Sequence, residues 1–459
     1  MQLRELHRAR NQCLNLGAVE IRKRVQRDIA RGLAGFAAGK NGAIVRAMSP
    51  TRADCEALDR EDALAHFRDR FALPEGVVYL DGNSLGPLPK AAPVRVAEVV
   101  QDEWGHDLIR SWNTHDWIGM SARVGDKIGR LIGAGPDETI AADSTSINLY
   151  KALSAALALR PERRTILSER GNFPTDLYMA QGLVAQLGNG YRLALVAPDA
   201  VANAIDCDTA AVLLTHVHYV TGRVHDMAAV TAAAHAKGAL TIWDLCHTAG
   251  AMPVDLNAAR ADFAVGCGYK WLNGGPGAPA FLYVAKRHQG AARPALSGWL
   301  GHADPFAFAQ DYAPAPGIGR FVVGTPPILS LAALEVGVDL MLEASLPALY
   351  DKAMRQFDLF RSLMDKRLAG RGFALVSVAG PGGRGSEIGY AHEEGWPIMR
   401  ALIARGIIGD FRAPNVLRFG IAPLYQRYTE IWDAVEGLRA IMDERLWDRA
   451  EYRARPIVT

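Results

Sequence analysis

Two segments of the chain end in side chains that can do chemistry together. Asp244 ends the apolar run in Thr241–His247, and Lys270 follows the next apolar run, in Gly266–Trp271. In open α/β sheets, ligands bind outside the carboxyl ends of the strands. If the two runs are neighbouring strands, a carboxylate and an amine therefore face one crevice. A lysine there can form a Schiff base and an aspartate can hold a protonated pyridine nitrogen, as pyridoxal phosphate chemistry requires.

The alternative interpretation is an ordinary surface lysine and an aspartate that caps the next helix. For either residue alone this alternative is the better one. The glycines at 268, 274, 275 and 277 clear space around Lys270. Together, the two residues and these glycines favour the cofactor interpretation.

A cofactor of this kind also needs a phosphate site and a flat contact for its ring. Ser144 and Thr145 precede an Ala/Leu-rich helical run, so they offer hydroxyls, free N–H groups and the positive end of a helix dipole. Phe173 stands in a Pro-stiffened loop where it can stack on a ring, although a buried loop phenylalanine is the commoner case. Asp176 is either a second hydrogen-bonding carboxylate or a helix N-cap.

Three histidines and one arginine are further candidates. His216 and His218 share one face of a strand, and His225 follows, but too few other ligands lie nearby, so we expect no metal site. Arg418 lies within a predicted strand, where an arginine near a cleft can bind a carboxylate through two hydrogen bonds.

Short, almost continuously apolar runs alternate with helical stretches such as Met227–Lys237. Such runs are typical of strands buried on both faces of a parallel sheet. The predicted strands are Thr165–Leu167, Tyr191–Val196, Ala211–His216, Leu240–Asp244, Phe263–Cys267 and Ala280–Val284.

The pattern changes after about residue 327. It predicts a helix ending near Leu368, a strand at Phe373–Val378, a Gly-rich loop, a helix at Pro397–Arg405, a strand at Val416–Gly420 and a last helix at Glu430–Trp447. We therefore expect an α/β protein with a large domain, whose mostly parallel sheet lies between helices, and a smaller C-terminal α+β domain.

Composition excludes several classes of protein. The chain has 459 residues, 49% of them hydrophobic and 22% charged, with a net charge of +2, so neither disorder nor a nucleic-acid or membrane partner is indicated. No apolar run reaches the roughly 18 residues of a membrane span. The five cysteines are scattered, which favours a reducing, cytoplasmic location.

The first stretch of the chain differs from the rest. Up to Met48 it carries ten basic residues against three acidic ones and has no apolar core typical of a secretory signal. We interpret residues 1–47 as a solvated extension or an early start, residues 48–330 as an N-terminal arm and the large domain, and residues 331–459 as the small domain.

An ordered set of motifs resembles the kynureninase family of fold-type-I pyridoxal phosphate enzymes. The resemblance runs from about Met48 to Thr459. It is carried by Tyr79–Gly86, Ile109–Asn113, Ser144–Leu149, Asn172–Tyr178, Trp243–His247, Gly268–Gly277, Leu296–Trp299, Gly324–Pro327 and Arg418–Gly420. Each motif is weak alone, but the ordered set is specific.

The resemblance implies a role for each matching residue. Lys270 would be the Schiff-base lysine, Asp244 the partner of the pyridine nitrogen and Phe173 the stacking ring. Further cofactor contacts would be Ser144, Thr145, Asp176, Thr215, His247 and Tyr269. Trp299 and Thr325 would reach the phosphate from a second subunit of a homodimer. Arg418 would hold the substrate carboxylate, and His106 and Ser84 would line the substrate pocket.

The implied reaction is the hydrolysis of L-kynurenine, or its 3-hydroxy form, to anthranilate or 3-hydroxyanthranilate and L-alanine in tryptophan catabolism. Lys270 would move the α-proton. Tyr269 would either relay a proton or only fix the phosphate, and the sequence leaves both roles open.

Other classes fit less well. A related aminotransferase and a silent pyridoxal-binding protein remain alternatives. A cysteine desulfurase needs a cysteine beyond the lysine, but the last cysteine, Cys267, precedes Lys270. A nicotinamide-binding Rossmann protein is disfavoured because no G-x-G-x-x-G follows the first strand.

Overall fold

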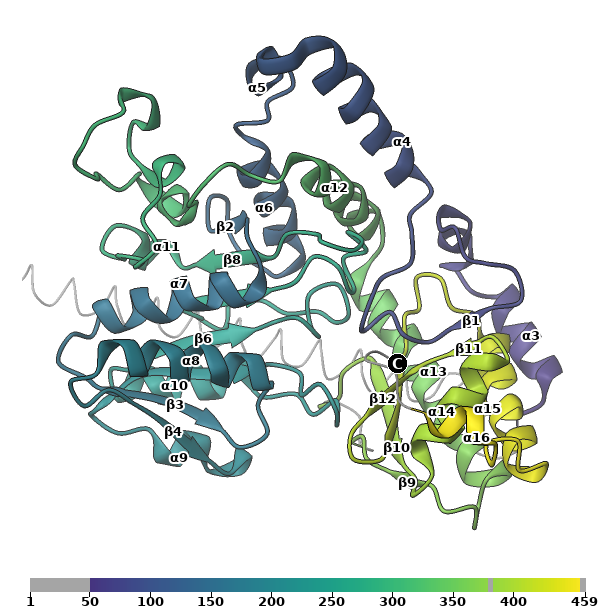
Figure 1. Ribbon diagram of the computed structural model, residues 1–459. Helices are drawn as coiled ribbons and strands as arrows, with labels where there is room; N and C mark the ends of the chain where they lie inside the picture. The colour runs from purple at the N-terminus through teal and green to yellow at the C-terminus, as the bar shows by residue number, and fades with distance from the viewer. Residues whose placement is uncertain (1–49, 379–382, 455–459) are drawn as a thin grey trace, which may run out of the picture.

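The computed structural model describes residues 50–378 and 383–454, and its centre is a seven-stranded sheet (Figure 1). The strand order is β2-β8-β7-β6-β5-β3-β4, and only β8 runs antiparallel to its neighbours. The strands are β2 (Thr139–Ala141), β3 (Thr165–Glu169), β4 (Arg192–Val196), β5 (Thr209–Thr215), β6 (Leu240–Asp244), β7 (Phe263–Gly266) and β8 (Phe281–Val284). The prediction of a mostly parallel sheet is confirmed.

Alternating side chains of these strands enter two separate cores, one on each face. Leu214 and Trp243 pack into one core, whereas their neighbours Leu213 and Ile242 pack into the other. This is the pattern of strands buried on both faces. The first core is closed by α6 (Met120–Leu131), α10 (Met227–Ala236) and α12 (Ile328–Glu343), and the second by α7 (Thr145–Ala158) and α8 (Pro174–Leu187).

A second, antiparallel sheet forms the other part of the molecule, with strand order β12-β13-β10-β9. Its strands are β9 (Ala374–Leu375), β10 (Glu387–Ala391), β12 (Asp410–Arg412) and β13 (Val416–Gly420). The helices packed with it are α13 (Leu346–Arg367), α14 (Gly395–Ala404), α15 (Tyr428–Asp443) and the short α16 (Ala450–Arg453). These elements share one core of apolar side chains, separate from the two cores of the large sheet.

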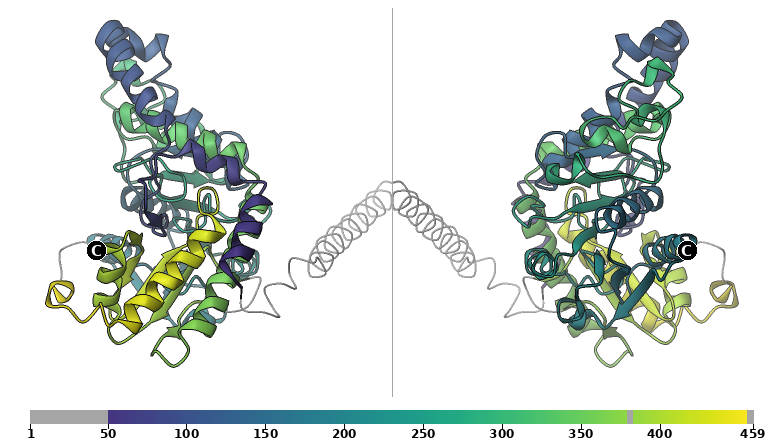
Figure 2. Two further views of the ribbon diagram at one scale, coloured as in Figure 1. Left: turned by 90° about the vertical axis from the view of Figure 1, so that its right-hand side faces the viewer. Right: turned by 90° about the vertical axis from the view of Figure 1, so that its left-hand side faces the viewer.

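The N-terminal part of the described chain joins this second unit. Helix α3 (Arg52–Arg60) packs along α15, as Figure 2 shows, and Cys55 of α3 is buried in the second unit's core. Strand β1 (Val78–Tyr79) pairs in parallel with β11 (Ile407–Ile408). The chain then crosses to the large sheet. The predicted domain boundary at residue 330 stays a prediction. The predicted N-terminal extension, residues 1–47, lies outside the described residues.

A long segment projects from the large sheet. It runs through α4 (Ala91–Glu98), a π-helical stretch (Val99–Asp107), a short turn (Leu108–Arg110) and α5 (Ser111–Thr114). In Figures 1 and 2 this segment extends beyond the body of the molecule. It carries exposed apolar side chains at Val94, Trp104 and Ile109.

Most of the predicted elements are found, with shifted ends. The strand predicted at Phe373–Val378 shrinks to Ala374–Leu375, because only these two residues pair with β10. β10 itself was not predicted. It follows a Gly-rich loop and contains Gly389, and its pairing with β13 is supplied by residues nearly thirty positions away.

Candidate active site

Lys270 and Asp244 line one cavity at the carboxyl ends of β6 and β7. The two strands are parallel neighbours, with Asp244 paired opposite Val265, so the sheet brings the two predicted residues together. The cavity has a volume of ≈ 220 Å³. It is lined by Thr145, Ser146, Phe173, Thr175, Asp176, Thr215, Tyr219, Asp244, Cys246, His247, Tyr269 and Lys270.

Close backbone packing holds the loop that carries Lys270. The N–H of Gly86 donates to the Tyr269 carbonyl oxygen at 2.8 Å, and a Cβ on Gly86 would overlap the carbonyl oxygen of Lys270. On the other side, a Cβ on Gly268 would overlap the carbonyl oxygen of Pro279. Glycine is thus required at both positions for steric reasons.

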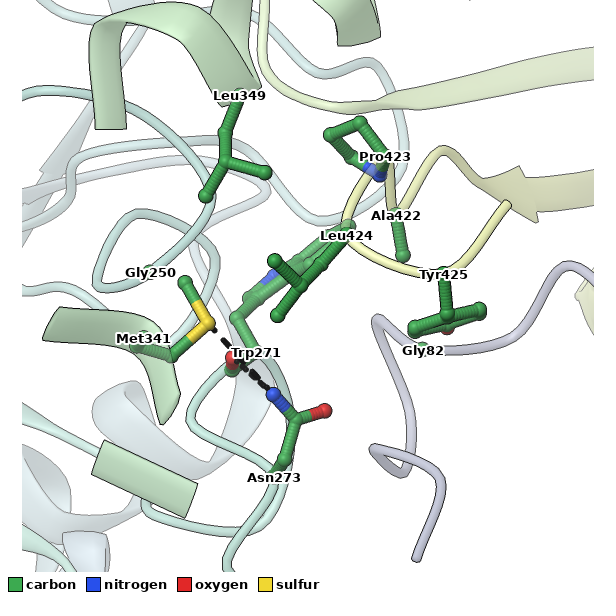
Figure 3. Close-up of a pocket in the computed structure, with 10 residues that line it drawn as sticks. All are labelled: Gly82, Gly250, Trp271, Asn273, Met341, Leu349, Ala422, Pro423, Leu424 and Tyr425. Atoms are coloured by element: carbon green, nitrogen blue, oxygen red, sulfur yellow. Dashed lines mark hydrogen bonds between the residues drawn. The ribbon is translucent and has the colours of Figure 1, made fainter. Parts of the chain in front are cut away.

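Behind the same loop lies a small cavity of ≈ 20 Å³ (Figure 3). Asn273 points into this region and donates from Nδ2 to the Trp271 carbonyl oxygen at 3.0 Å and to the Met341 sulfur at 3.7 Å. Tyr425 closes it from the second unit beside Gly82, where a Cβ would overlap the phenol oxygen. The cavity has room for about one water molecule, so the loop is packed against both units with little free space.

A chain of two hydrogen bonds leads from the lysine into the second unit. Nζ of Lys270 lies 3.1 Å from Nε2 of His247, and Nδ1 of His247 lies 2.7 Å from Oε2 of Glu387. Burial, followed by the charge of Lys270, lowers the pKa of His247 well below its usual range. Burial raises the pKa of Glu387 to about 8, although the charges of Arg418 and Lys270 oppose this rise. His247 is therefore neutral at pH 7.

A second group of polar side chains surrounds Asp244. Its Oδ1 accepts from the backbone N–H of Cys246 at 2.7 Å. Asp176 is buried beside it, and burial together with the charge of Asp244 raises the pKa of Asp176 well above its usual range. Thr215 donates to Asp176 at 3.3 Å. The two carboxyl groups therefore face each other at the bottom of the cavity, and the charge of Asp244 favours the protonated form of Asp176.

Aromatic rings and a helix N-terminus complete the cavity. The Lys270 nitrogen lies 6.0 Å from the centre of the Phe173 ring and 5.8 Å from that of Tyr269. Tyr219 meets Phe173 edge-on at 5.2 Å. Ser144 caps α7 by accepting from the N–H of Ile147 at 3.4 Å, so the N-terminus of α7 opens toward Thr145 and the cavity. Burial raises the pKa of Tyr269, which keeps the phenol protonated.

Arg418 lies in a separate site beside this cavity, where other residues of the chain occupy its hydrogen-bond donors. Its side chain is 1% exposed, and its Nε and Nη2 donate to both carboxylate oxygens of Asp410, with 2.9 Å for the Nε bond. It also donates to the Tyr219 carbonyl oxygen and, at 3.2 Å, to the hydroxyl of Ser84. The predicted neighbours Arg418 and Ser84 are thus brought together, but an internal carboxylate already occupies the arginine.

Arg412 is a second arginine on the same carboxylate. Its Nη2 donates to Oδ2 of Asp410 at 2.6 Å, its side chain is 36% exposed, and its Nε has no partner among the described residues. Although burial opposes ionisation of Asp410, the two arginines lower the pKa of that carboxyl. A second carboxyl group, Asp81, interacts with the same arginines and with Asp410, and burial followed by the charge of Asp410 raises the pKa of Asp81 to about 7.

Besides Arg418, Ser84 and Ser144, three further predicted site residues do not line the cavity within one chain. His106 lies on the projecting segment with its side chain 80% exposed, next to Asp107 at 2.9 Å. Trp299 is 43% exposed, and Thr325 is exposed as well. None of the three lines the cavity around Lys270.

The histidines considered for a metal have other partners. His216 lies 2.9 Å from the hydroxyl of Thr248, His218 3.0 Å from the Gly171 carbonyl oxygen, and His225 3.0 Å from Glu169. In the part of the chain that the structure describes, no group of three metal-ligating side chains is found.

Several residues of these sites were not predicted from the sequence, among them Tyr219, Glu387, Asp410 and Arg412. The contact of Glu387 with His247 spans 140 positions of the chain, so no local motif marks it. Asp410 and Arg412 give a weak signal, since they precede the Arg418 strand with alternating spacing.

Among the helices that the structure describes, none combines the length and the apolar character that a membrane span requires.

Comparison with known proteins gives the class that this fold and site define. A family model described as Aminotransferase class-V matches residues 122–367, and one described as Kynureninase C-terminal domain matches residues 349–438. The cysteine desulfurase CsdA from Escherichia coli has the same fold, with a TM-score of 0.71 at 18% identity over 83% of this chain and 99% of that one. The cysteine desulfurase from Thermococcus onnurineus NA1 gives 0.70 at 18% identity over 83% and 98%. The molecule is a fold-type-I pyridoxal phosphate enzyme.

The particular family follows from closer relatives. Kynureninase from Burkholderia mallei (strain SAVP1) is 50% identical over 414 residues, which is 89% of this chain and all of that protein. Kynureninase from Pseudomonas fluorescens shows the same identity and coverage. The chain belongs to the kynureninase family, and its cofactor is pyridoxal 5'-phosphate.

The residues present fit that cofactor. An amine, a carboxyl group and a ring from Phe173 meet in one cavity, and the N-terminus of α7 offers hydroxyl and N–H donors to a phosphate. Lys270, Asp244, Phe173 and Thr145 are the residues that would hold the group.

Proposed function

We propose that the chain hydrolyses the Cβ–Cγ bond of L-kynurenine, or of 3-hydroxy-L-kynurenine, to give L-alanine and anthranilate or its 3-hydroxy form. This places it in tryptophan catabolism and the supply of NAD precursors. The observation that carries the proposal is the meeting of Lys270 and Asp244 in one cavity, in a chain that matches whole kynureninases at 50% identity.

The bound cofactor supplies an electron-accepting ring and an aldehyde that reacts with amines. Asp244 acts on that ring from the strand end, where its charge would hold a proton on the pyridine nitrogen. Asp176, whose pKa is raised by burial and by the charge of Asp244, would support that carboxylate by donating a hydrogen bond to it in its protonated form. Phe173 would cover one face of the ring and exclude water from it.

Lys270 is the residue proposed to bind the cofactor and to carry the α-proton of the substrate. Once released by the substrate amine, its nitrogen needs an acceptor to hold it in place. Neutral His247, 3.1 Å away, provides one. Tyr269 would donate its phenol proton to the phosphate, which its raised pKa permits.

The α-carboxylate of the substrate is proposed to bind at the two-arginine site. Arg418, the residue expected for this role, is held by Asp410 and Ser84, so it acts as a buried anchor that sets the positive charge. The Arg412 side chain is 36% exposed, whereas that of Arg418 is buried, so Arg412 offers an incoming carboxylate the more accessible of the two positive charges. Both arginines lie near enough to His247 to lower its pKa.

A homodimer would complete the site. Trp299, Phe306 and Phe308 form an exposed aromatic cluster, with ring centres 5.5 Å apart for the first pair and 6.4 Å for Trp299 and Phe308. Exposed aromatic groups of this kind are typical of protein interfaces. We propose that this cluster and the projecting segment pack against a second copy, which would bring Trp299 and Thr325 to the partner's cofactor phosphate.

The scattered thiols, free at all four described positions, fit the proposed cytoplasmic location.

The test is an absorption spectrum of the protein loaded with pyridoxal phosphate, before and after L-kynurenine is added. The expected result is a visible band followed by the fluorescence of anthranilate, with no band and no anthranilate for Lys270→Met. A band without anthranilate, with stoichiometric conversion of the cofactor by amino donors, would instead indicate an aminotransferase. No band for the native protein would overturn the proposal.

A further inference from the structure

Glu387 is a fully buried carboxyl group whose surroundings differ from those of a structural one. It begins β10 in the second unit, and its side chain is 0% exposed. One oxygen, Oε2, contacts His247, whereas Oε1 is buried with no partner among the described residues. Burying a carboxyl group with half of its capacity unused is costly.

Glu138 shows what a structural carboxylate looks like in the same chain. Its Oε2 accepts from Gly135 at 2.7 Å and from Asn257 at 2.8 Å, and its Oε1 accepts from Lys286 at 2.9 Å. Both of its oxygens therefore hold backbone and loops in place. The side chain of Glu387 contacts only the imidazole ring of His247, so we expect this carboxyl group to act through that ring.

The ring of His247 has two neighbours with different demands. Lys270 approaches Nε2 with an N–H donor, which requires a lone pair on Nε2. A neutral imidazole then carries its proton on Nδ1, and this proton needs an acceptor. Oε2 of Glu387, at 2.7 Å, is that acceptor, either as a carboxylate oxygen or as the carbonyl oxygen of a carboxylic acid.

We propose that Glu387 is a positioning residue that holds His247 in the Nδ1–H tautomer, so that the lone pair of Nε2 faces the amine of Lys270. The inference deepens the proposed function and rests on it for the role of Lys270. It makes the second unit a contributor to the lysine's surroundings, since the acceptor comes from β10 while His247 and Lys270 come from the large sheet.

The first test uses the native protein without cofactor. Nitrogen NMR of protein labelled in the histidine rings distinguishes a protonated from an unprotonated ring nitrogen, and the variant His247→Gln identifies the signal. We expect Nδ1 of His247 to be protonated and Nε2 to be unprotonated at pH 7. A proton on Nε2 would overturn the proposal.

The second test compares two substitutions of Glu387. Glu387→Gln keeps an acceptor oxygen, so it should preserve the tautomer and change the dissociation constant of pyridoxal phosphate by no more than about twofold. Glu387→Leu removes the acceptor, so it should give a mixture of tautomers and weaken cofactor binding about tenfold, the size of one hydrogen bond. The pH midpoint of the visible band should shift in Glu387→Leu only.

Asp262→Asn is the matched control. Asp262 is a buried carboxylate that contacts His235 at 2.8 Å and His288 at 2.7 Å, at the start of β7 and so at the opposite end of the strands from Lys270. The Asp262→Asn variant should have a lower melting temperature but an unchanged His247 signal and an unchanged cofactor affinity. Native-like tautomer and affinity in Glu387→Leu would overturn the proposal. If that variant does not fold, the native signal and Glu387→Gln decide.

Failure of the proposed function would look different. A protein that binds pyridoxal phosphate but releases no anthranilate, while His247 carries its proton on Nδ1, refutes the reaction and leaves the role of Glu387 intact. Anthranilate formation with the proton on Nε2 refutes only the role of Glu387.

Discussion

Replacing Arg412 by glutamine should weaken substrate binding while leaving the fold in place. The guanidinium of Arg412 donates to Asp410 at 2.6 Å and, more weakly, to the Ser84 hydroxyl at 3.5 Å, and the Asp410 carboxylate keeps both of its bonds to Arg418 after the change. Glutamine retains part of the side-chain packing and one donor group. Thus the loss is confined to the positive charge of the half-buried guanidinium, which would face an incoming carboxylate.

The magnitude follows from the exposure of the arginine. A hydrogen bond to a charged group is worth about 1.5–3 kcal/mol. Because the Arg412 side chain is 36% exposed, water screens the contact and the lower end of that range applies. We therefore expect KM to rise about tenfold. The turnover number should change less than about twofold, since the carboxylate keeps its charge through the reaction and its binding is uniform.

Arg418 is a poorer probe of the same contact. Removing it leaves the buried Asp410 with a single partner, and breaking a buried ion pair costs about 3–5 kcal/mol of folding free energy. Its variants should therefore lose stability and activity together.

The assay is steady-state kinetics by anthranilate fluorescence, with melting temperatures as a check on folding. Arg371→Gln is the control, because Arg371 also pairs with an aspartate, Asp443, but at the surface of the second unit. The control should leave KM unchanged. If Arg412→Gln keeps the native KM within twofold, Arg412 does not bind the carboxylate and the reasoning from its accessible charge is wrong.

Three further outcomes are expected. Lys270→Met should show no visible band after loading with pyridoxal phosphate and dialysis, measured by absorption; a persistent band would mean that another amine binds the cofactor. Gly86→Ala should weaken cofactor binding at least about tenfold, because its Cβ would overlap the Lys270 carbonyl oxygen; native affinity by fluorescence titration would contradict this. Burial lowers the pKa of His216 from 6.5 to about 4. The contribution of neutral His216 to the free energy of unfolding should therefore be fully present above pH 6.5 and decrease by about 3 kcal/mol toward pH 4, measured by urea unfolding. His216→Gln should lack this part of the pH dependence; an unchanged profile would contradict the assignment.

Strands of both sheets could be predicted where their signals are local. Leu240–Asp244 and Val416–Gly420 are found with the predicted ends, since continuous apolar runs and β-branched residues mark buried strands directly. The meeting of Asp244 and Lys270 followed from a topological rule about parallel strands and needed no knowledge of side-chain contacts.

The rest of the site depends on contacts between distant parts of the chain. β10 pairs with β13 and with the two-residue β9, so its register is set by partners that no local pattern reveals. Glu387 meets His247 across 140 positions, and Arg418 meets Ser84 across 334. The occupation of Arg418 by Asp410 could not be predicted either, because an arginine in a strand has the same sequence signal whether its partner is a substrate or a neighbour.

The two units contribute different residues to the site, and this difference bears on substrate specificity. The cavity around Lys270 is built mainly from the ends of the large sheet's strands, and this sheet belongs to a fold shared with cysteine desulfurases at only 18% identity. Such a frame supplies cofactor chemistry common to many reactions. The groups that would choose this substrate, the two arginines and Asp410, come from β12 and β13 of the second unit, as does the acceptor for His247 from β10. A change of reaction within this fold is therefore expected to require changes in the second unit's strands while Asp244 and Lys270 stay as they are.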